Sequence, residues 1–154
     1  MIHRKKAIIA LDLGLNTGWA IFNHEGIMSG HENFDVARGV HRCYSFMHYA
    51  FWLAEMLDKF KITHLYYEEV VSHAGSRAAH VYGSFETTTE LEACIRGIVP
   101  TGIGVTTIKK FATSNGHADK PMMIRAAQQH NPSITSDNEA DAFHLLRYAM
   151  QNTE

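Results

Sequence analysis

The sequence predicts a single α/β domain built on a five-stranded mixed sheet. Three apolar segments of strand length follow one another near the start of the chain, and later strand-like segments alternate with helix-like ones. Strands joined by short turns pair antiparallel, whereas strands joined through helices pair parallel. With 154 residues, 45% of them hydrophobic, the chain is long enough to bury a core in one domain spanning residues 1–154.

The first three strands are expected at residues 6–12, 17–23 and 26–34. An apolar run ends at Asp12, the segment 14–18 ("GLNTG") turns the chain, and 23–26 ("NHEG") provides a hairpin connection. These strands are expected to form an antiparallel meander on one side of the sheet.

Residues 39–60 carry apolar side chains at helical spacing, which predicts a helix. The apolar stripe consists of Val40, Cys43, Met47, Ala50, Ala54 and Leu57. Aromatic side chains widen this surface: Tyr44, Phe46, Tyr49, Phe51 and Trp52. A helix that is apolar on two sides is buried twice, so we expect helix 39–60 to pack on its own core and on a partner chain.

Strands alternate with helices in the rest of the chain. Further strands are expected at 62–69 and 102–106, and helices at 77–96, 107–114, 119–130 and 136–151. The expected apolar stripe of helix 77–96 is Ala78, Val81, Phe85, Thr88, Leu91 and Ile95. The last helix begins at Ser136, because Ser136-x-x-Glu139 is a capping box. Open α/β sheets bind ligands at the carboxyl ends of their parallel strands, so functional residues are expected there.

Acidic residues occupy three positions where burial makes a carboxylate costly. Asp12 and the pair Glu68–Glu69 end apolar strands, and Asp141 lies one turn inside the last helix among apolar neighbours. Side chains alternate along a strand, so only one of Glu68 and Glu69 faces the same way as Asp12. Clustered carboxylates repel one another unless a cation such as Mg²⁺ binds between them, and acids around two such ions suit phosphodiester hydrolysis. Taken singly, each acid is also compatible with a solvent-exposed strand end.

Three lysines lie where an anionic ligand would be bound. Lys120, beside Pro121, stands near a helix start, where the helix dipole disfavours a cation and a bound phosphate would favour one. Lys109 and Lys110 follow the fifth strand and are well placed for a DNA backbone, although a solvated helix face explains them equally well.

Composition restricts the function class only weakly. The net charge of −2 argues mildly against a sequence-independent nucleic-acid binder, but the 11 histidines reduce the force of that argument. No apolar run is long enough to span a bilayer, and the short run before Asp12 is interpreted as a strand rather than a signal peptide. The two cysteines, Cys43 and Cys94, show no metal-type spacing, so a reduced, cytoplasmic protein is expected.

Four segments together resemble the RuvC-type Holliday-junction resolvases, of the small kind found in phages. They are "LDLGLNTGWA", "YYEEVVSHAGSRAAHVYG", "TTIKKFATSNGHADKPMM" and "DNEADAFHLL". The resemblance implies a ribonuclease-H-like fold and a homodimer, here through helix 39–60, that nicks opposed strands of a four-way DNA junction. It also implies two Mg²⁺ ions per site, with Mn²⁺ able to substitute.

The same resemblance assigns roles to residues of this chain. It gives Asp12, Glu68 and Asp141 as catalytic metal-binding acids and Lys120 as the catalytic lysine. His73, Arg77 and His80 are candidate phosphate contacts, with surface or core roles as the alternative for the histidines. The family has an acid three residues before the final aspartate, where this chain has Asn138. Either Asn138 through its amide oxygen or Asp137 could complete the metal site.

Three other functions remain open at the level of sequence. The motif "DLGLNTG" also resembles the phosphate loop of actin-like ATPases, but those proteins need a second such loop, which this chain lacks. The replacement at Asn138 is compatible with a junction-binding protein that has lost cleavage. A nuclease acting on flaps, forks and other branched DNA is the third alternative.

Overall fold

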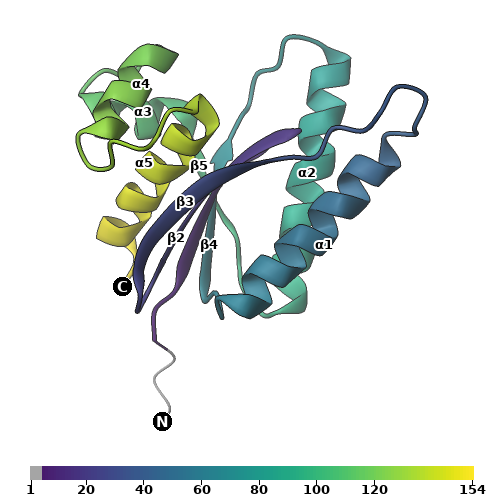
Figure 1. Cartoon of the computed structure of the whole chain (residues 1–154), viewed down its shortest axis with the longest axis horizontal. Coiled ribbons are helices and arrows are strands. Elements are labelled where there is room, and N and C mark those ends of the chain that lie inside the picture. The colour runs from purple at the N-terminus through teal and green to yellow at the C-terminus, as the bar shows by residue number, and fades with distance from the viewer. Residues whose placement is uncertain (1–4) are drawn as a thin grey trace.

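The computed structural model describes residues 5–154, which form a five-stranded mixed sheet with helices on both faces (Figure 1). The strands are β1 (Ile8–Asp12), β2 (Asn16–Asn23), β3 (Gly26–Asn33), β4 (His64–Glu69) and β5 (Thr101–Gly104). Their order across the sheet is β3-β2-β1-β4-β5, with β1, β2 and β3 antiparallel and β1, β4 and β5 parallel. The predicted fold class, strand count and pairing are therefore confirmed.

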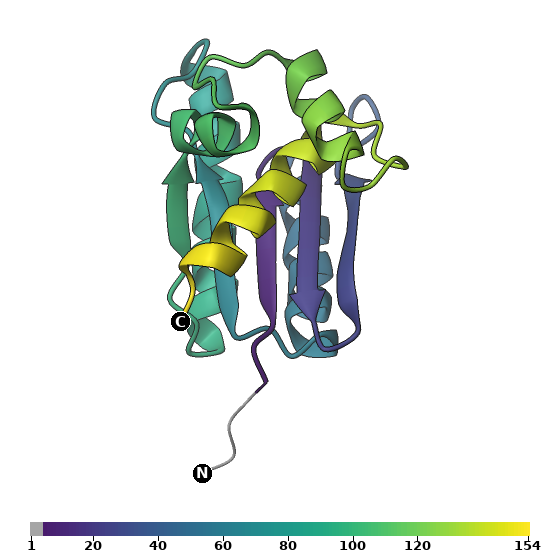
Figure 2. The same cartoon turned by 90° about the vertical axis from the view of Figure 1, so that its left-hand side faces the viewer.

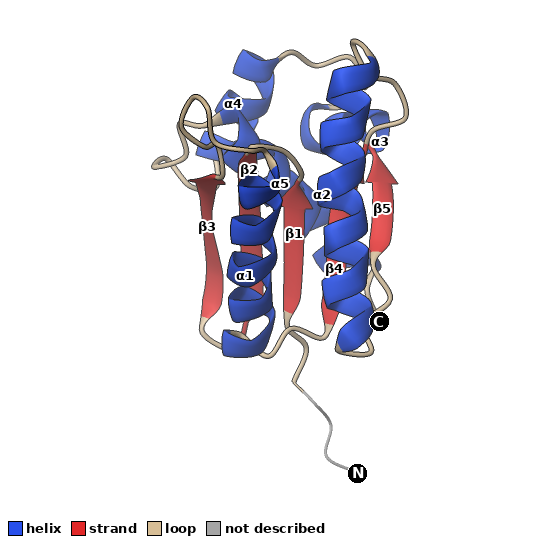
Figure 3. Ribbon diagram, turned by 90° about the vertical axis from the view of Figure 1, so that its right-hand side faces the viewer, coloured by secondary structure: helices blue, strands red, loops and turns tan. Residues whose placement is uncertain are grey.

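Two helices cover one face of the sheet and three lie on the other. On the first face are α1 (Cys43–Lys59) and α2 (Ser76–Ile95), which run side by side (Figure 3). On the second are α3 (Val105–Thr113), α4 (Lys120–Gln128) and α5 (Asp137–Asn152), and α5 crosses the strands diagonally (Figure 2). None of the helices in residues 5–154 is long and apolar enough to cross a membrane.

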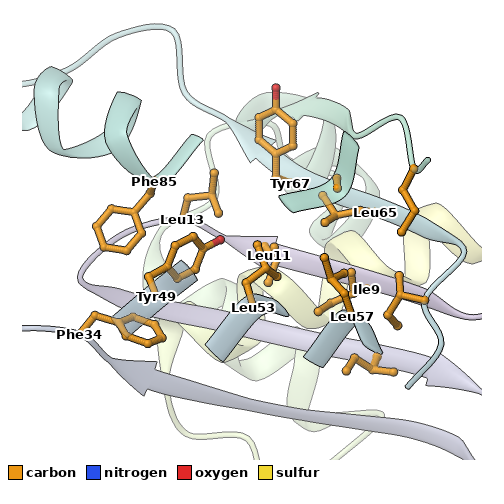
Figure 4. Packing of buried hydrophobic residues seen from close by; sticks show 14 of the residues in the cluster. Ile9, Leu11, Leu13, Phe34, Tyr49, Leu53, Leu57, Leu65, Tyr67 and Phe85 are labelled. Carbon is orange, nitrogen blue, oxygen red and sulfur yellow. The ribbon is translucent and has the colours of Figure 1, made fainter. Parts of the chain in front are cut away.

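The central strand β1 supplies both hydrophobic cores. Ile9 and Leu11 point to the α1–α2 side, and Ile8 and Ala10 point to the α5 side. Side chains alternate between the two faces along a strand, and both faces of β1 are buried. The sequence of β1 is therefore continuously apolar up to Asp12. On the α1–α2 side, aromatic rings from three segments pack together (Figure 4), with Tyr49 and Phe85 4.8 Å apart at their centroids.

The buried stripe of α1 differs from the predicted one. The helix begins at Cys43 rather than residue 39, and its buried residues are Ser45, Tyr49, Leu53 and Leu57. Met47 of the predicted stripe is 39% exposed, and Val40, in the preceding loop, is 45% exposed. The prediction was wrong here because α1 is apolar on two sides and spacing alone does not identify the side that meets the sheet.

The stripe of α2 is also displaced from the prediction. Its buried residues are Tyr82, Phe85, Thr89 and Ala93, whereas Leu91 and Ile95 are exposed. The hydroxyls of Thr89 and Tyr49 hydrogen-bond at 2.7 Å in the buried contact between α1 and α2. A polar pair at the helix contact therefore replaces part of the expected apolar stripe.

The start of α5 is held against the sheet by three local features. The Ser136 hydroxyl accepts from the Glu139 amide (3.4 Å), as the predicted capping box requires, but the Glu139 carboxylate instead accepts from the Ser29 hydroxyl of β3 (2.7 Å). Gly18 of β2 leaves room for the backbone of Asn138, since a Cβ at Gly18 would lie 1.8 Å from the Asn138 carbonyl oxygen. These contacts bring the first turns of α5 to the carboxyl ends of β1 and β4.

Candidate active site

Asp12 and Glu68 end neighbouring parallel strands and face the same side of the sheet. Leu11 of β1 is in register with Tyr67 of β4, so Asp12 and Glu68 are the next residues along each strand. Asp12 continues the row of Ile8 and Ala10, which faces α5. Both carboxylates therefore point toward α5, whereas the adjacent Glu69 is exposed on the other side.

Asp141 completes a group of three interacting carboxylates. Burial raises the pKa of Asp12 well above its ordinary value, and the charges of Glu68 and Asp141 raise it further. Burial, together with the charge of Asp141, raises the pKa of Glu68 to about 7. Burial also raises the pKa of Asp141 to about 6, with Asp137 adding to the effect. Repulsion between acidic groups and their burial away from water thus both raise the pKa values at this site.

Lys120 is held over the site by an ion pair with Asp137. The Lys120 ammonium lies 2.5 Å from the Asp137 carboxylate, and the lysine side chain is 79% exposed. This contact lowers the pKa of Asp137 and raises that of Lys120. The lysine charge also lowers the pKa values of Asp12 and Asp141, so Lys120 lies close enough to act on the carboxylate group.

Lys109 contributes a second positive charge from the opposite side. It lies in α3, immediately after β5, and its charge lowers the pKa values of Glu68 and Asp141. The contact of Lys109 with the DNA backbone stays a prediction, and the position of Lys109 lets its charge offset those of the acids. Lys110, its neighbour, is exposed on α3.

An open groove of about 960 Å³ lies next to the site, since Leu13, Lys120 and Asp137 line it; Asp12, Glu68 and Asp141 are not among its lining residues. We call it the active-site groove. It is lined by the loop after β1 (residues 13–16), residues 70–82 and the starts of α4 and α5, including His73, Arg77, Lys120, Asp137 and Asn138. Two of the three predicted phosphate contacts, His73 and Arg77, therefore line the groove. His80 is exposed on α2 and does not line it.

Tyr82 is a site residue that the sequence reasoning missed. Its hydroxyl donates to the Glu68 carbonyl (2.9 Å) and accepts from the Val70 amide (3.1 Å), and its ring lies 4.9 Å from that of His73. Tyr82 therefore fixes the end of β4 that carries Glu68. The only signal in the sequence was an aromatic residue beside the predicted stripe of helix 77–96, which is too common to identify this role.

The donor set has the chemistry of a site for hard divalent cations. Three carboxylates and the Asn138 amide offer oxygen ligands, which Mg²⁺ and Mn²⁺ prefer. The raised pKa values of Asp12, Glu68 and Asp141 indicate a site that lacks positive charge. Within residues 5–154, no three His, Cys, Asp or Glu side chains stand close enough to share one ion. The fit of a divalent cation to this site therefore rests on the oxygen donors present and on the negative charge of the carboxylates.

Three solved structures with a similar fold are those of Holliday junction resolvases. Thermus thermophilus RuvC in complex with a Holliday junction substrate aligns with a TM-score of 0.78 and 16% identity, over 96% of this chain and 97% of that chain. A second T. thermophilus RuvC structure gives 0.77 and 17% over the same shares. The yeast mitochondrial Holliday junction resolvase gives 0.62 and 12%, over 94% of this chain and 78% of the yeast chain.

Sequence comparison adds no closer relative. No protein-family model matches the chain, and no curated protein sequence matches it. At identities of 12–17% the structural similarity establishes the fold. The chain has the ribonuclease-H-like fold of the RuvC resolvases over almost its whole length, as its four sequence segments predicted.

Proposed function

We propose that the chain is a metal-dependent endonuclease that resolves four-way (Holliday) DNA junctions by paired, symmetric nicks. The observation that carries the proposal is the convergence of Asp12, Glu68 and Asp141 on one side of a RuvC-like sheet, beside an open groove. The aligned resolvases, one of them bound to a junction, support this substrate class.

The proposed cofactor is a pair of Mg²⁺ ions, with Mn²⁺ able to substitute. Asp12, Glu68 and Asp141 would hold them, and the Asn138 amide is the favoured fourth donor because the Asp137 carboxylate is already paired with Lys120. Such ions supply Lewis acidity that activates water and neutralises the leaving oxygen of a phosphodiester.

Lys120 is proposed to stabilise the negative charge that develops on the phosphate. Its ammonium stands over the carboxylates, and Asp137 limits where it can move. A positioned charge of this kind lowers the barrier because it needs no reorganisation during the reaction. Lys109, in α3, is proposed to contact the backbone of the DNA strand that is cleaved.

DNA is proposed to enter through the active-site groove. His73 and Arg77 line it and would contact phosphates, whereas His80 and Lys110 are more distant candidates on exposed helix faces. Phosphate contacts supply most of the affinity of such proteins and make it dependent on salt.

A homodimer is proposed through α1. Tyr44, Met47 and Phe51 form an exposed apolar stripe at helical spacing, on the side of α1 that faces away from the core. Two equivalent nicks require two equivalent sites, which a twofold dimer provides.

A cytoplasmic location is proposed because Cys43 and Cys94 are both free and exposed, as is usual in a reducing compartment.

The test is cleavage of a labelled, immobile four-way junction beside a linear duplex, a flap and a fork, with Mg²⁺ and with EDTA. Symmetric nicks on the junction that require the metal are expected. Equal cutting of flaps and forks would keep the metal site but replace the substrate by branched DNA in general. Tight junction binding without cutting, in Mg²⁺ and in Mn²⁺, would refute the nuclease and favour the binding protein that Asn138 leaves open.

A further inference from the structure

A second, smaller groove continues from the active-site groove toward the loop before α1. It encloses about 250 Å³ and shares Leu15, Arg77 and Val81 with the active-site groove. The rest of its lining comes from loop residues 35–40 and the start of α1, including Arg38 and Arg42. We call it the arginine groove. Because the two grooves share three lining residues, they lie next to each other.

The arginine groove carries a local excess of positive charge. Arg38, Arg42 and Arg77 line it with a single acid, Asp35, whose carboxylate accepts from the Val36 amide (3.0 Å). The ion pairs found within residues 5–154 join Arg96 to Asp58 and Glu92, and Lys120 to Asp137, so none of them engages these three arginines. The charge of the groove is thus available to a ligand.

Two helix ends reinforce the same preference. Arg42 is the N-cap residue of α1, and Arg77 lies in the first turn of α2. Neither helix has an acidic residue in its first turn or a side-chain cap. Both helices begin at the end of the sheet where β1, β4 and β5 finish (Figure 3). A cation at a helix N-terminus is unfavourable, and a bound anion removes that cost at both ends.

We infer that the arginine groove binds backbone phosphates of the DNA strand as it continues past the cleavage site. The inference rests on the proposed function and adds a second binding site to it. Guanidinium groups pair with phosphates through two parallel hydrogen bonds, and Leu15, Phe46 and Val81 give the groove apolar walls for the sugars. A continuous strand fits better than a free nucleotide because the arginine groove adjoins the active-site groove.

The test is the salt dependence of junction binding by the double variant Arg38→Ala/Arg42→Ala, measured in EDTA so that nothing is cut. Both side chains are exposed, so the fold tolerates their removal. Two lost phosphate contacts reduce the slope of log K against log salt by about 1.8, which weakens binding by a factor on the order of 60 at about 0.1 M salt. In a separate cleavage assay with Mg²⁺, the KM of the double variant for the junction rises, whereas its kcat on saturating junction stays the same.

The matched control removes two exposed charges from the other end of α1. Lys59→Ala/Lys61→Asn lowers the net charge equally, and asparagine suits the left-handed backbone of Lys61 (φ 50°). This control is expected to bind within about threefold of the unaltered protein, because long-range steering alone is weak near physiological salt. If the Arg38/Arg42 variant binds as tightly as the control at every salt concentration, the inference is overturned.

A second measurement locates the contact on the DNA. Junctions with a single neutral methylphosphonate in place of one phosphate are bound by the unaltered protein and by the arginine variant. The unaltered protein loses affinity at one or two linkages away from the scissile one, and the variant loses none there. Identical profiles for the two proteins would also overturn the inference.

These outcomes are separable from failure of the proposed function. Junction binding that depends on Arg38 and Arg42, but without cleavage, would refute the nuclease and leave the arginine groove standing. Cleavage that proceeds without these arginines, at unchanged KM and affinity, would refute the groove and leave the nuclease standing. Absence of any DNA binding by the unaltered protein would refute both.

Discussion

Ionising Asp12, Glu68 and Asp141 costs more free energy in the folded chain than in the unfolded chain. Burial raises the pKa of each, and repulsion by neighbouring acids raises it further, so the folded chain retains protons that the unfolded chain has already released. Such local instability is typical of functional sites and is removed when a cation binds. The carboxylates are therefore expected to couple metal binding to stability.

Replacing Glu68 by glutamine should remove much of this pH dependence. The pKa of Glu68 rises from 4.5 to about 7 on folding, so the folded chain keeps a proton that the unfolded chain has already released. Stability from this group is present below about pH 4.5 and is lost as the pH rises toward 7. In EDTA, the unaltered protein should lose on the order of 3 kcal/mol more than Glu68→Gln between pH 5 and 8. Urea unfolding at both pH values measures this, and parallel pH profiles would contradict it.

Asp12→Asn should separate cleavage from binding. The substitution removes one charge from the centre of the carboxylate group and keeps the shape of the side chain. Cleavage should fall by at least about 100-fold, the size of effect seen when one preorganised electrostatic contributor is lost. Junction affinity in EDTA should stay the same or improve, since a buried negative charge near DNA is gone. Loss of affinity in parallel with cleavage would mean that Asp12 has a structural role.

Lys120→Ala should slow turnover without weakening the fold. The lysine is 79% exposed and its ion pair with Asp137 lies near the surface, so unfolding free energy should change by less than about 1 kcal/mol. Single-turnover cleavage should fall more than junction affinity does. Arg125→Ala, an exposed basic residue in the last turn of the same helix, is the matched control. An equal effect of the two substitutions on cleavage would exclude Lys120 from the site.

At the level of elements, the strands were predictable and the faces of the helices were not. β1 was predictable because it is apolar on both sides and ends in Asp12. The order of strands and helices along the chain predicted the mixed sheet. The stripes of α1 and α2 were displaced because both helices carry apolar residues on more than one side. Choosing the buried side needs the partner surface, which a single helix does not encode.

The site was predictable in its acids and not in its connections. Asp12, Glu68 and Asp141 could be found because each is an acid in an apolar setting. The ion pair of Lys120 with Asp137 joins residues separated by a whole helix and a loop, and the hydrogen bond of Tyr82 to the Glu68 carbonyl reaches across a loop. No local spacing carries such contacts, because they depend on how α2, α4 and α5 are placed by the sheet.

Gly18→Ala should disturb the placement of α5. A Cβ at Gly18 would lie 1.8 Å from the Asn138 carbonyl oxygen, which is backbone and cannot rotate away. The start of α5 would have to move, at a cost of about 1–3 kcal/mol or more, and Asp141 would move with it. Gly83→Ala is the control, because a Cβ at Gly83 would meet nothing within 4 Å and Gly83 lines neither groove. Thermal unfolding and cleavage should both suffer for Gly18→Ala only, and equal effects would contradict the close-packing argument.

At the scale of the whole molecule, paired cleavage requires two active sites that are related by a twofold axis. Each chain presents a carboxylate group at one end of its sheet, and α1 lies on the opposite face from α5 (Figures 1 and 3). Tyr44, Met47 and Phe51 on the outer side of α1 line neither the active-site groove nor the arginine groove, so the proposed twofold contact uses other residues than DNA binding does. The exposed apolar side chains of α1 are otherwise a liability in water.

Phe51→Glu should convert the proposed dimer into monomers that nick without coordination. Phe51 is 67% exposed and lies midway along α1, so a twofold contact through the middle of the helix would bring two introduced carboxylates together across the axis. Sedimentation should show a dimer for the unaltered protein and a monomer for the variant. With the variant, the fraction of junctions that receive both nicks before the complex dissociates should fall, while single nicks persist. Ile27→Glu is the control, because Ile27 is 48% exposed on β3, beside a pocket lined by α5. A variant that stays dimeric, or an unaltered protein that is monomeric yet makes paired nicks, would exclude α1 as the interface.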